Sequence, residues 1–239
     1  DVTARMRRIL LSLYTAMVAF LPASGCLISD ISLQNGEETA VAATLGALFI
    51  NLTADRTAYF KATNASNGDA FGRSIAIDAD TLVVGSPLED SSVAAIFNSS
   101  DLSETDDNAT GSGAVYVFFR ENGGWSFQGY LKAPDSLSAG DQFGFSVDVS
   151  GDTIVVGAPG EDSPSTTAST DSIPTDDSGE NNGAAYVYAR GSDGLWSFQA
   201  YLKAPNYSYA DCFGASLAID GFSVVVGAPL EDSNSTRVI

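Results

Sequence analysis

The feature that most constrains this chain is an internal repeat. The pair Phe-Gly occurs at positions 71, 143 and 213, so it returns after 72 and then 70 residues. Each pair is followed by a strand pattern, a turn, and an apolar run that closes in Gly-Ala-Pro or Gly-Ser-Pro. The repeated motif positions are Phe71, Gly72, Gly85, Pro87, Phe143, Gly144, Gly157, Pro159, Phe213, Gly214, Gly227 and Pro229. A sequence that repeats at such a period folds as supersecondary units that pack on their neighbours.

The remainder of each unit repeats as well. An acidic loop leads into a strand at 113–118 or 183–188, and a glycine turn then leads into a Trp-containing strand that ends in Tyr-Leu-Lys-Ala-Pro. Four short strands in about 70 residues are typical of a β-propeller blade with one long loop. The runs at 81–84, 153–156 and 223–226 are apolar and β-branched, which predicts sheets covered on both faces. The glycines then allow close backbone approach, and the prolines end the second strands.

These units predict an all-β fold, a β-propeller of four-stranded blades spanning residues 46–239. The predicted order is a half blade at 46–62, blades at 69–134 and 141–205, and a partial blade at 211–239. About three blade equivalents cannot close a ring whose minimum is about four. We therefore expect a fragment of a larger propeller with exposed sheet edges, which are prone to pairing.

Repeats of Phe-Gly followed by Gly-Ala-Pro resemble the FG-GAP repeats of integrin α-chain propellers and of integrin-like secreted proteins. The resemblance covers residues 46–233 and implies a ring of about seven blades, with the Phe-Gly strand innermost. Integrin blades of this type often carry a calcium loop between the first and second strands. The corresponding turns here, 78–80, 148–152 and 220–221, are too short for the roughly six to eight oxygen ligands of calcium. They are predicted to be hairpin turns, with calcium as an alternative and no cofactor otherwise.

Composition excludes several classes of function. The 30 acidic against 11 basic residues give a net charge of −19, so the chain would repel nucleic acid. Without histidine, neither a Ser-His-Asp or Cys-His nucleophile nor a His-containing zinc site can be built. No catalytic constellation is visible in the sequence. We predict that this segment is not an enzyme.

Acidic residues gather in the long loops at 88–112 and 160–182, which hold 12 of them and no Lys or Arg. Glu89, Glu161 and Glu231 recur at the start of these loops. They could hold a cation or belong to solvated acidic loops, and no metal is predicted.

Other repeated polar and aromatic positions have structural interpretations. Repeated Asp and Lys positions are expected to form blade-to-blade hydrogen bonds or ion pairs, because every blade has them. The repeated aromatic residues could form a sugar-stacking surface, but their strand positions favour packing between blades. The positions concerned are Asp69, Asp141, Asp211, Lys61, Lys132, Lys203, Tyr116, Tyr186, Trp125 and Trp196.

The N-terminal region has the pattern of a secretory signal peptide, predicted at 1–25 and followed by a linker at 26–45. Arg7 and Arg8 precede an apolar run at 9–21 that ends in small residues. This run is shorter than the roughly 20 residues of a membrane span. Cys26 directly follows the small residues, so lipidation of Cys26 is the alternative to ordinary cleavage. The only other cysteine, Cys212, is expected to be buried and free.

Six Asn-x-Ser/Thr acceptors occur, against about two expected by chance from the composition. They are candidate glycosylation sites at Asn51, Asn64, Asn98, Asn108, Asn206 and Asn234. An excess of acceptors favours a glycosylated secreted protein.

The leading hypothesis is an extracellular, secreted or cell-surface module, non-catalytic, that binds a protein or glycan ligand in adhesion. One alternative is a propeller appendage of a secreted or surface enzyme whose catalytic domain lies outside this chain. Another is a structural repeat of a surface or matrix protein. No nucleic-acid partner is expected, and a membrane is expected only through a lipid anchor or a segment beyond this sequence.

Overall fold

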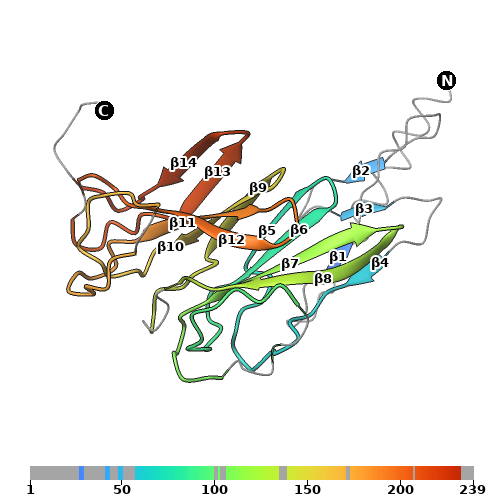
Figure 1. Cartoon of the computed structure of the whole chain (residues 1–239), viewed down its shortest axis with the longest axis horizontal. Helices are drawn as coiled ribbons and strands as arrows, with labels where there is room; N and C mark the ends of the chain where they lie inside the picture. The colour runs from blue at the N-terminus through green and yellow to red at the C-terminus, as the bar shows by residue number, and fades with distance from the viewer. Residues whose placement is uncertain are drawn as a thin grey trace. The chain divides into compact units, whose positions relative to one another are not determined.

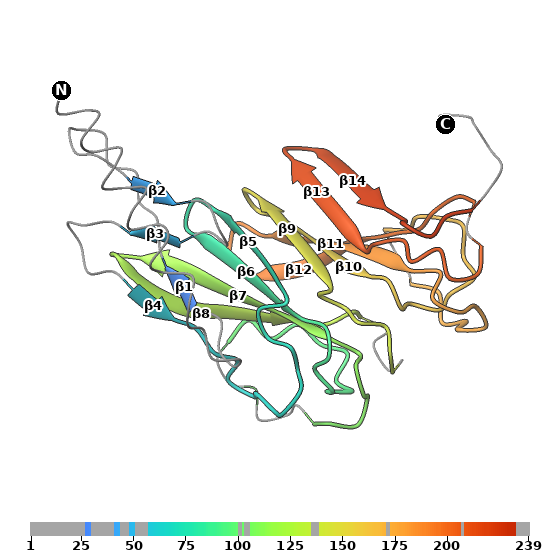
Figure 2. The ribbon, with the colours of Figure 1, turned by 180° about the vertical axis from the view of Figure 1, so that it is seen from behind.

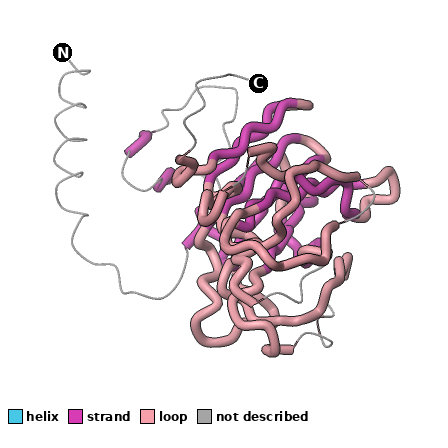
Figure 3. The backbone as a smooth tube through the Cα atoms, turned by 90° about the vertical axis from the view of Figure 1, so that its left-hand side faces the viewer, coloured by secondary structure: helices cyan, strands magenta, loops and turns pink. Residues whose placement is uncertain are grey.

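The computed structural model describes residues 27–29, 41–43, 48–50, 57–99, 102, 106–134, 139–170, 173–206 and 208–232. These residues form strands, turns and loops, with no helix among them (Figures 1 and 3). The chain divides into two compact units, Asp1–Phe60 and Lys61–Ile239. In the first unit β1 pairs with β4 and β2 with β3, all antiparallel. Their bounds are β1 Leu27–Ser29, β2 Val41–Ala43, β3 Leu48–Ile50 and β4 Thr57–Tyr59.

The second unit contains two four-stranded antiparallel sheets and one hairpin. The strand orders are β5-β6-β7-β8, β9-β10-β11-β12 and β13-β14, each in chain order or its reverse. Their bounds are β5 Ser74–Asp78, β6 Thr81–Ser86, β7 Ala114–Glu121, β8 Gly124–Leu131, β9 Ser146–Ser150, β10 Thr153–Ala158, β11 Ala184–Arg190, β12 Trp196–Leu202, β13 Ser216–Asp220 and β14 Ser223–Gly227. The predicted all-β fold of four-stranded blades is confirmed, and the described sheets do not close into a ring.

The two complete sheets repeat each other in detail. Asp78 pairs with Thr81 across β5–β6, and Ser150 pairs with Thr153 across β9–β10, so each hairpin has a two-residue turn. A register irregularity occurs at the same repeat position in β7–β8 and in β11–β12, where it increases the local twist. The strands β6 and β10 end at Ser86 and Ala158, the residues directly before Pro87 and Pro159, because proline has no backbone N–H to donate.

The main core lies between the two complete sheets. One cluster combines apolar residues of the first sheet with those of the second, among them Val83, Val115, Phe143, Val147 and Ile154. The ring of Phe143 is fully buried and meets Tyr186 edge-on, with ring centroids 5.3 Å apart. Burial of both sheet faces explains why β6 and β10 contain consecutive apolar residues instead of an alternation of apolar and polar ones.

The second and third Phe-Gly pairs each join one blade to the blade before it. Phe143 forms a parallel bridge with Gly113, and Phe213 forms the same bridge with Gly183. Gly144 follows with φ of +88°, and a Cβ there would meet the carbonyl oxygen of Ala114, so glycine is required twice over. The first strands β5, β9 and β13 consequently lie side by side (Figure 2). This matches the innermost position that the family resemblance implies for them.

Candidate functional site

The long loops between second and third strands begin at a buried ion pair. In the first sheet, Lys132 Nζ donates to Glu89 Oε2 at 3.0 Å and to Ser112 Oγ at 2.7 Å. The side chains of Lys132 and Glu89 are almost fully buried. Lys132 follows β8, Glu89 begins the loop and Ser112 ends it, so one cluster ties the three segments together. A buried, hydrogen-bonded ion pair fixes the geometry of the segments that it joins, and removing either partner leaves an uncompensated charge.

The second sheet repeats this cluster. Lys203 Nζ donates to Glu161 Oε2 at 2.6 Å and to the carbonyl oxygen of Ser163 at 2.8 Å, while Tyr201 donates to Glu161 Oε1 at 2.7 Å. The sequence suggested that the repeated lysines bond from blade to blade and placed the glutamates in a cation site or a solvated loop. Lys132 and Lys203 instead pair with Glu89 and Glu161 of their own blades. The signal that could have paired them is register, because Glu follows the Pro by two residues and Lys follows Tyr-Leu in both copies.

A polar network extends the first cluster. Asn64 Nδ2 donates to Glu89 Oε1 at 2.9 Å, and Tyr116 donates its hydroxyl proton to Asn64 Oδ1 at 2.6 Å. Burial, followed by the charge of Glu89, raises the pKa of Tyr116 and of Tyr130 far above the usual value. Burial lowers the pKa of Lys132, and Glu89 opposes that shift. The phenols of Tyr116 and Tyr130 therefore stay neutral at neutral pH.

Aspartates just before the Phe-Gly pairs hold the blade-to-blade turns. Asp69 accepts from the backbone N–H of Ser66 at 2.7 Å and from its hydroxyl at 2.8 Å. Asp211 accepts from the hydroxyl of Ser208 at 2.8 Å in the same way. Asp69 and Asp211 therefore bond within their own turns, whereas the sequence suggested bonds from blade to blade.

Acidic side chains inside the long loops also accept backbone donors. Asp90 accepts from the N–H of Gly111 at 2.7 Å, and Asp162 accepts from the N–H of Asn181 at 2.6 Å. Asp106 accepts from the N–H of Ser92 at 2.8 Å, and this bond, with others to Ser92 and Asn108, lowers the pKa of Asp106 to about 2. The carboxylates thus order the loops that carry them.

The opposite end of the blades carries the short turns considered for calcium. Asp80 lies 2.9 Å from Arg120 Nε, and Asp152 lies 2.6 Å from Arg190 Nη2, each in its own sheet. Asp78 Oδ2 accepts from the N–H of Gly151 in the next blade at 2.6 Å. These carboxylates are used in ion pairs and blade-to-blade bonds.

The comparisons with known proteins decide the family. The family model described as FG-GAP repeat matches residues 55–101, 125–188 and 196–238, more than half of the chain. This chain belongs to the FG-GAP repeat family. The family assignment makes it a propeller-type binding module, and FG-GAP repeats typically occur in extracellular or surface proteins. A search of curated proteins found no match.

The described part of the chain shows neither a metal-binding cluster nor a membrane-spanning helix. Across the described ranges, no three Asp, Glu or Cys side chains are arranged to hold a metal ion. Within those same ranges, no helix has the length and hydropathy that a membrane crossing needs.

The aromatic residues of the FG-GAP blades pack between strands. Tyr116, Tyr186 and Trp196 are buried and offer no stacking surface. The indole N–H of Trp196 donates to Gln128 Oε1 in the preceding blade at 3.0 Å. Trp125 is half-buried, with the Arg120 guanidinium 5.3 Å from its ring. Packing therefore accounts for Tyr116, Tyr186 and Trp196, which offer no surface for sugar stacking, whereas Trp125 is partly exposed.

The glycosylation candidates differ in what their amides do. Asn98 bonds the Trp196 backbone twice, accepting at 2.7 Å and donating at 3.1 Å. Asn64 is half-buried in the network of Glu89. Asn108 and Asn206 are exposed, the first donating to Asp106 at 2.6 Å and the second to Glu231 at 3.1 Å. Two further candidates and the lipidation candidate lie outside the described residues: Asn51, Asn234 and Cys26.

Cys212 immediately precedes the third Phe-Gly pair. It is free and half-buried, and burial, followed by the charge of Asp211, raises the pKa of its thiol. A thiol with a raised pKa is a weak nucleophile at neutral pH. Its backbone φ of +56° matches +58° at Ala70 and +57° at Gln142, so this position has a conformational role in every repeat.

Proposed function

We propose that this FG-GAP segment is an extracellular, non-catalytic binding module that contacts a protein or glycan partner through the loops between second and third strands. The observation that carries the proposal is that these loops have buried, fixed ends and exposed middle segments. Their ends are anchored by the buried Glu89–Lys132 and Glu161–Lys203 pairs. Between those anchors the two loops differ in sequence and expose polar side chains. Variable loops on a rigid repeated scaffold are where binding specificity usually lies.

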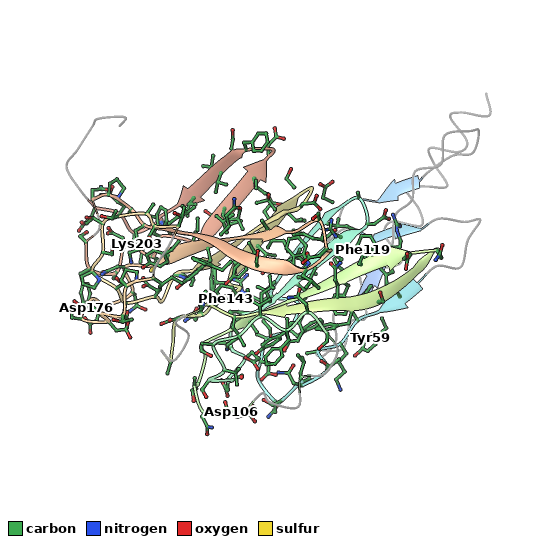
Figure 4. All side chains as sticks on the ribbon, in the orientation of Figure 1. Tyr59, Asp106, Phe119, Phe143, Asp176 and Lys203 are labelled. Carbon is green, nitrogen blue, oxygen red and sulfur yellow. The ribbon has the colours of Figure 1, made fainter. Side chains whose placement is uncertain are left out.

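The two loops project from the same end of the sheets. Figure 4 places Asp106 and Asp176 beyond one end of the strands, and Phe119 toward the other. Asp176 and Asp177 are exposed, and no basic residue lies in either loop. An acidic surface of this kind favours a partner with a basic contact region and accelerates association at low salt.

Loop variants test the proposal. The purified chain would be screened against arrays of extracellular matrix proteins and of glycans, and the D176N/D177N variant would be measured on any ligand found. Each lost charge contact should weaken binding several-fold and flatten its salt dependence. The matched control is E121Q/D193N, which removes two exposed charges from the opposite end. Equal losses in both variants, or no ligand on either array, would contradict the proposal.

Secretion is a separate part of the same proposal, supported by the signal-peptide pattern at 1–25 and the acceptor excess. Expression of the full sequence in a eukaryotic cell should yield a soluble product in the medium whose mass falls on glycosidase treatment. A membrane-partitioning product with acyl mass on Cys26 would contradict it and support the lipid-anchor alternative.

A further inference from the structure

The pair Asn-Gly occurs four times in the sequence. Three of these pairs lie in the described part of the chain: Asn67-Gly68, Asn122-Gly123 and Asn182-Gly183. Such a pair is able to react with itself, because glycine has no Cβ that would keep its backbone nitrogen away from the Cγ atom of the preceding asparagine. The reaction also needs a side-chain amide and a backbone N–H that are free to move, and the three pairs differ in this respect.

The pair Asn67-Gly68 is the most open of the three. Both residues are exposed in the loop that precedes β5, and within the described ranges no hydrogen bond holds the Asn67 amide or the Gly68 N–H. Gly68 has a φ of +109°, and a Cβ placed there would find no atom within 4 Å. The Asn67 side chain therefore has room to approach the Gly68 nitrogen. The bonds from Ser66 to Asp69 close the loop around the pair but involve neither of its residues.

The other two described pairs are restrained in different ways. Asn182 is 1% exposed and donates from Nδ2 to the carbonyl oxygen of Ser163 at 3.2 Å. The reacting nitrogen of Gly183 is held as well, since its N–H donates to a carbonyl oxygen at 2.9 Å. Asn122 and Gly123 are exposed but form the two-residue turn of β7–β8, with φ of +51° and +78° and paired strands on both sides. Formation of a ring rotates the asparagine backbone, and the paired strands oppose this rotation.

We propose that Asn67 is a site of spontaneous deamidation in the folded protein. The Gly68 nitrogen loses its proton and bonds to Asn67 Cγ, the Cγ–Nδ2 bond breaks, and Nδ2 takes up a proton and leaves as ammonia. Water then opens the resulting succinimide ring. Addition of water at Cγ gives aspartate, and addition at the main-chain carbonyl carbon gives isoaspartate, in which the chain runs through Cγ. Water is consumed and ammonia is released, and the reaction needs no other reactant.

Deamidation at this position would distinguish the first repeat from the following two. The equivalent residues there are Ala139 and Tyr209, which have no side-chain amide. Both products add a negative charge to the loop, and isoaspartate also adds a backbone atom between Ser66 and Asp69, which are joined by hydrogen bonds of 2.7 and 2.8 Å. Isoaspartate should therefore loosen the turn that precedes the first Phe-Gly pair. This proposal is independent of the proposed ligand binding.

Peptide mapping of the folded 239-residue chain tests the proposal, with the other two pairs as internal controls. Protein made in bacteria, which carries no glycan, would be incubated at mildly alkaline pH and then digested in heavy-oxygen water, so that conversion during digestion is marked. Trypsin releases Asn67 in the peptide at 62–73 and Asn122 in the peptide at 121–132. We expect Asn67 to convert several-fold faster than Asn122, and Asn182 to convert slowest. Methylation by an isoaspartate methyltransferase identifies the isoaspartate fraction of each peptide.

Unfolding separates the effect of the fold from that of the sequence. In concentrated urea the three pairs have the same reacting residues and no fold, so their rates of conversion should converge. A folded chain in which Asn67 keeps its amide while Asn122 converts would overturn the proposal, as would equal rates at these two positions. Rates that differ as much in urea as in the folded protein would also overturn it, because the neighbouring sequence and not the fold would then set the reactivity.

Discussion

The complete blade β9–β12 and the hairpin β13–β14 share the repeat motif of their first two strands but differ in their surroundings. Val155 is fully buried where Val225 is 68% exposed, and Glu161 is buried where Glu231 is exposed. The third and fourth strands and a following blade account for these differences. The comparison shows that a strand of this family becomes interior only through its neighbours, so stability should reside in the contacts between strands and between blades.

The largest contrast should come from the two glutamates. In E161Q, Lys203 loses its buried counter-charge, which should cost about 3–5 kcal/mol. E231Q changes an exposed side chain and should stay within about 0.5 kcal/mol of the wild type. Urea unfolding followed by Trp196 fluorescence, in a Trp125→Phe background that leaves one tryptophan, would report on this blade.

A double variant controls for this interpretation. E161L/K203M removes both charges and should recover most of the loss, because no unpaired charge stays buried. If E161Q were as stable as E231Q, the pair would not be desolvated in solution.

Two glycines give the next contrast. A Cβ at Gly157 would collide with the carbonyl oxygen of Gly214 in the following repeat and with Ser146 Oγ. At the equivalent Gly227 only the side chain of Ser216 is close, and it can rotate away. G157A should therefore lower the free energy of unfolding by about 1–3 kcal/mol. The loss should lie near the upper end of this range, because the backbone carbonyl of Gly214 cannot move away as a side chain can. G227A should be nearly neutral.

Thermal unfolding of G157A and G227A would measure this contrast. Equal destabilisation by both variants would show that the following blade is not the cause.

The valines give a smaller contrast. V155A removes two buried methyl groups and should cost about 2 kcal/mol, from lost burial and the cavity that is left. V225A removes methyl groups that are already in contact with water and should cost less than about 0.5 kcal/mol. Urea midpoints of the two variants give the comparison, and a cost of V225A close to that of V155A would mean that β14 is covered in solution.

The repeat made most of the fold predictable. Phe-Gly, Gly-Ala-Pro and the Trp-containing strand recur in register, and register reveals strand order without any contact being known. The role of the glycines followed from the same logic, and Gly144 and Gly214 do lie against carbonyl oxygens of the preceding blade. Repetition cannot reveal burial at the ends of the series, so the difference between Val155 and Val225 was not predictable from two strands that share the motif Val-Val-Gly-Ala-Pro.

The candidate site was predicted less well, because pairing depends on geometry that a sequence pattern does not contain. Glu89 and Lys132 are 43 residues apart in sequence and bond in space. The acidic residues that follow Glu89 suggested a cation site or a solvated loop, because a run of carboxylates in a sequence is compatible with both. The glycosylation acceptors also have a second explanation. Asn64 and Asn206 occur at the same position of the repeat, as do Ser66 and Ser208. Part of the excess of Asn-x-Ser/Thr acceptors over chance therefore comes from the repeat itself.

These two asparagines provide the smallest contrast. Asn64 bonds both Glu89 and Tyr116, so N64A leaves a buried carboxylate and a buried hydroxyl each short of one partner, at about 1–2 kcal/mol. Asn206 donates to Glu231 at the exposed end, and N206A should cost less than about 0.5 kcal/mol. The difference should appear in urea unfolding of protein from bacteria, where neither residue carries a glycan.

The same contrast predicts the extent of modification in a eukaryotic secretory cell. A glycan on Asn64 would have to fit beside a half-buried amide bonded on both sides, whereas Asn206 faces solvent. Peptide mapping of the secreted, folded protein should therefore find Asn206 occupied to a higher level than Asn64. Matched variants N64Q and N206Q assign each glycan by its loss of mass. Full occupancy of Asn64 in folded protein would mean that its bonds to Glu89 and Tyr116 do not persist, and the buried network of the complete blade would then be as open as the exposed end of the hairpin.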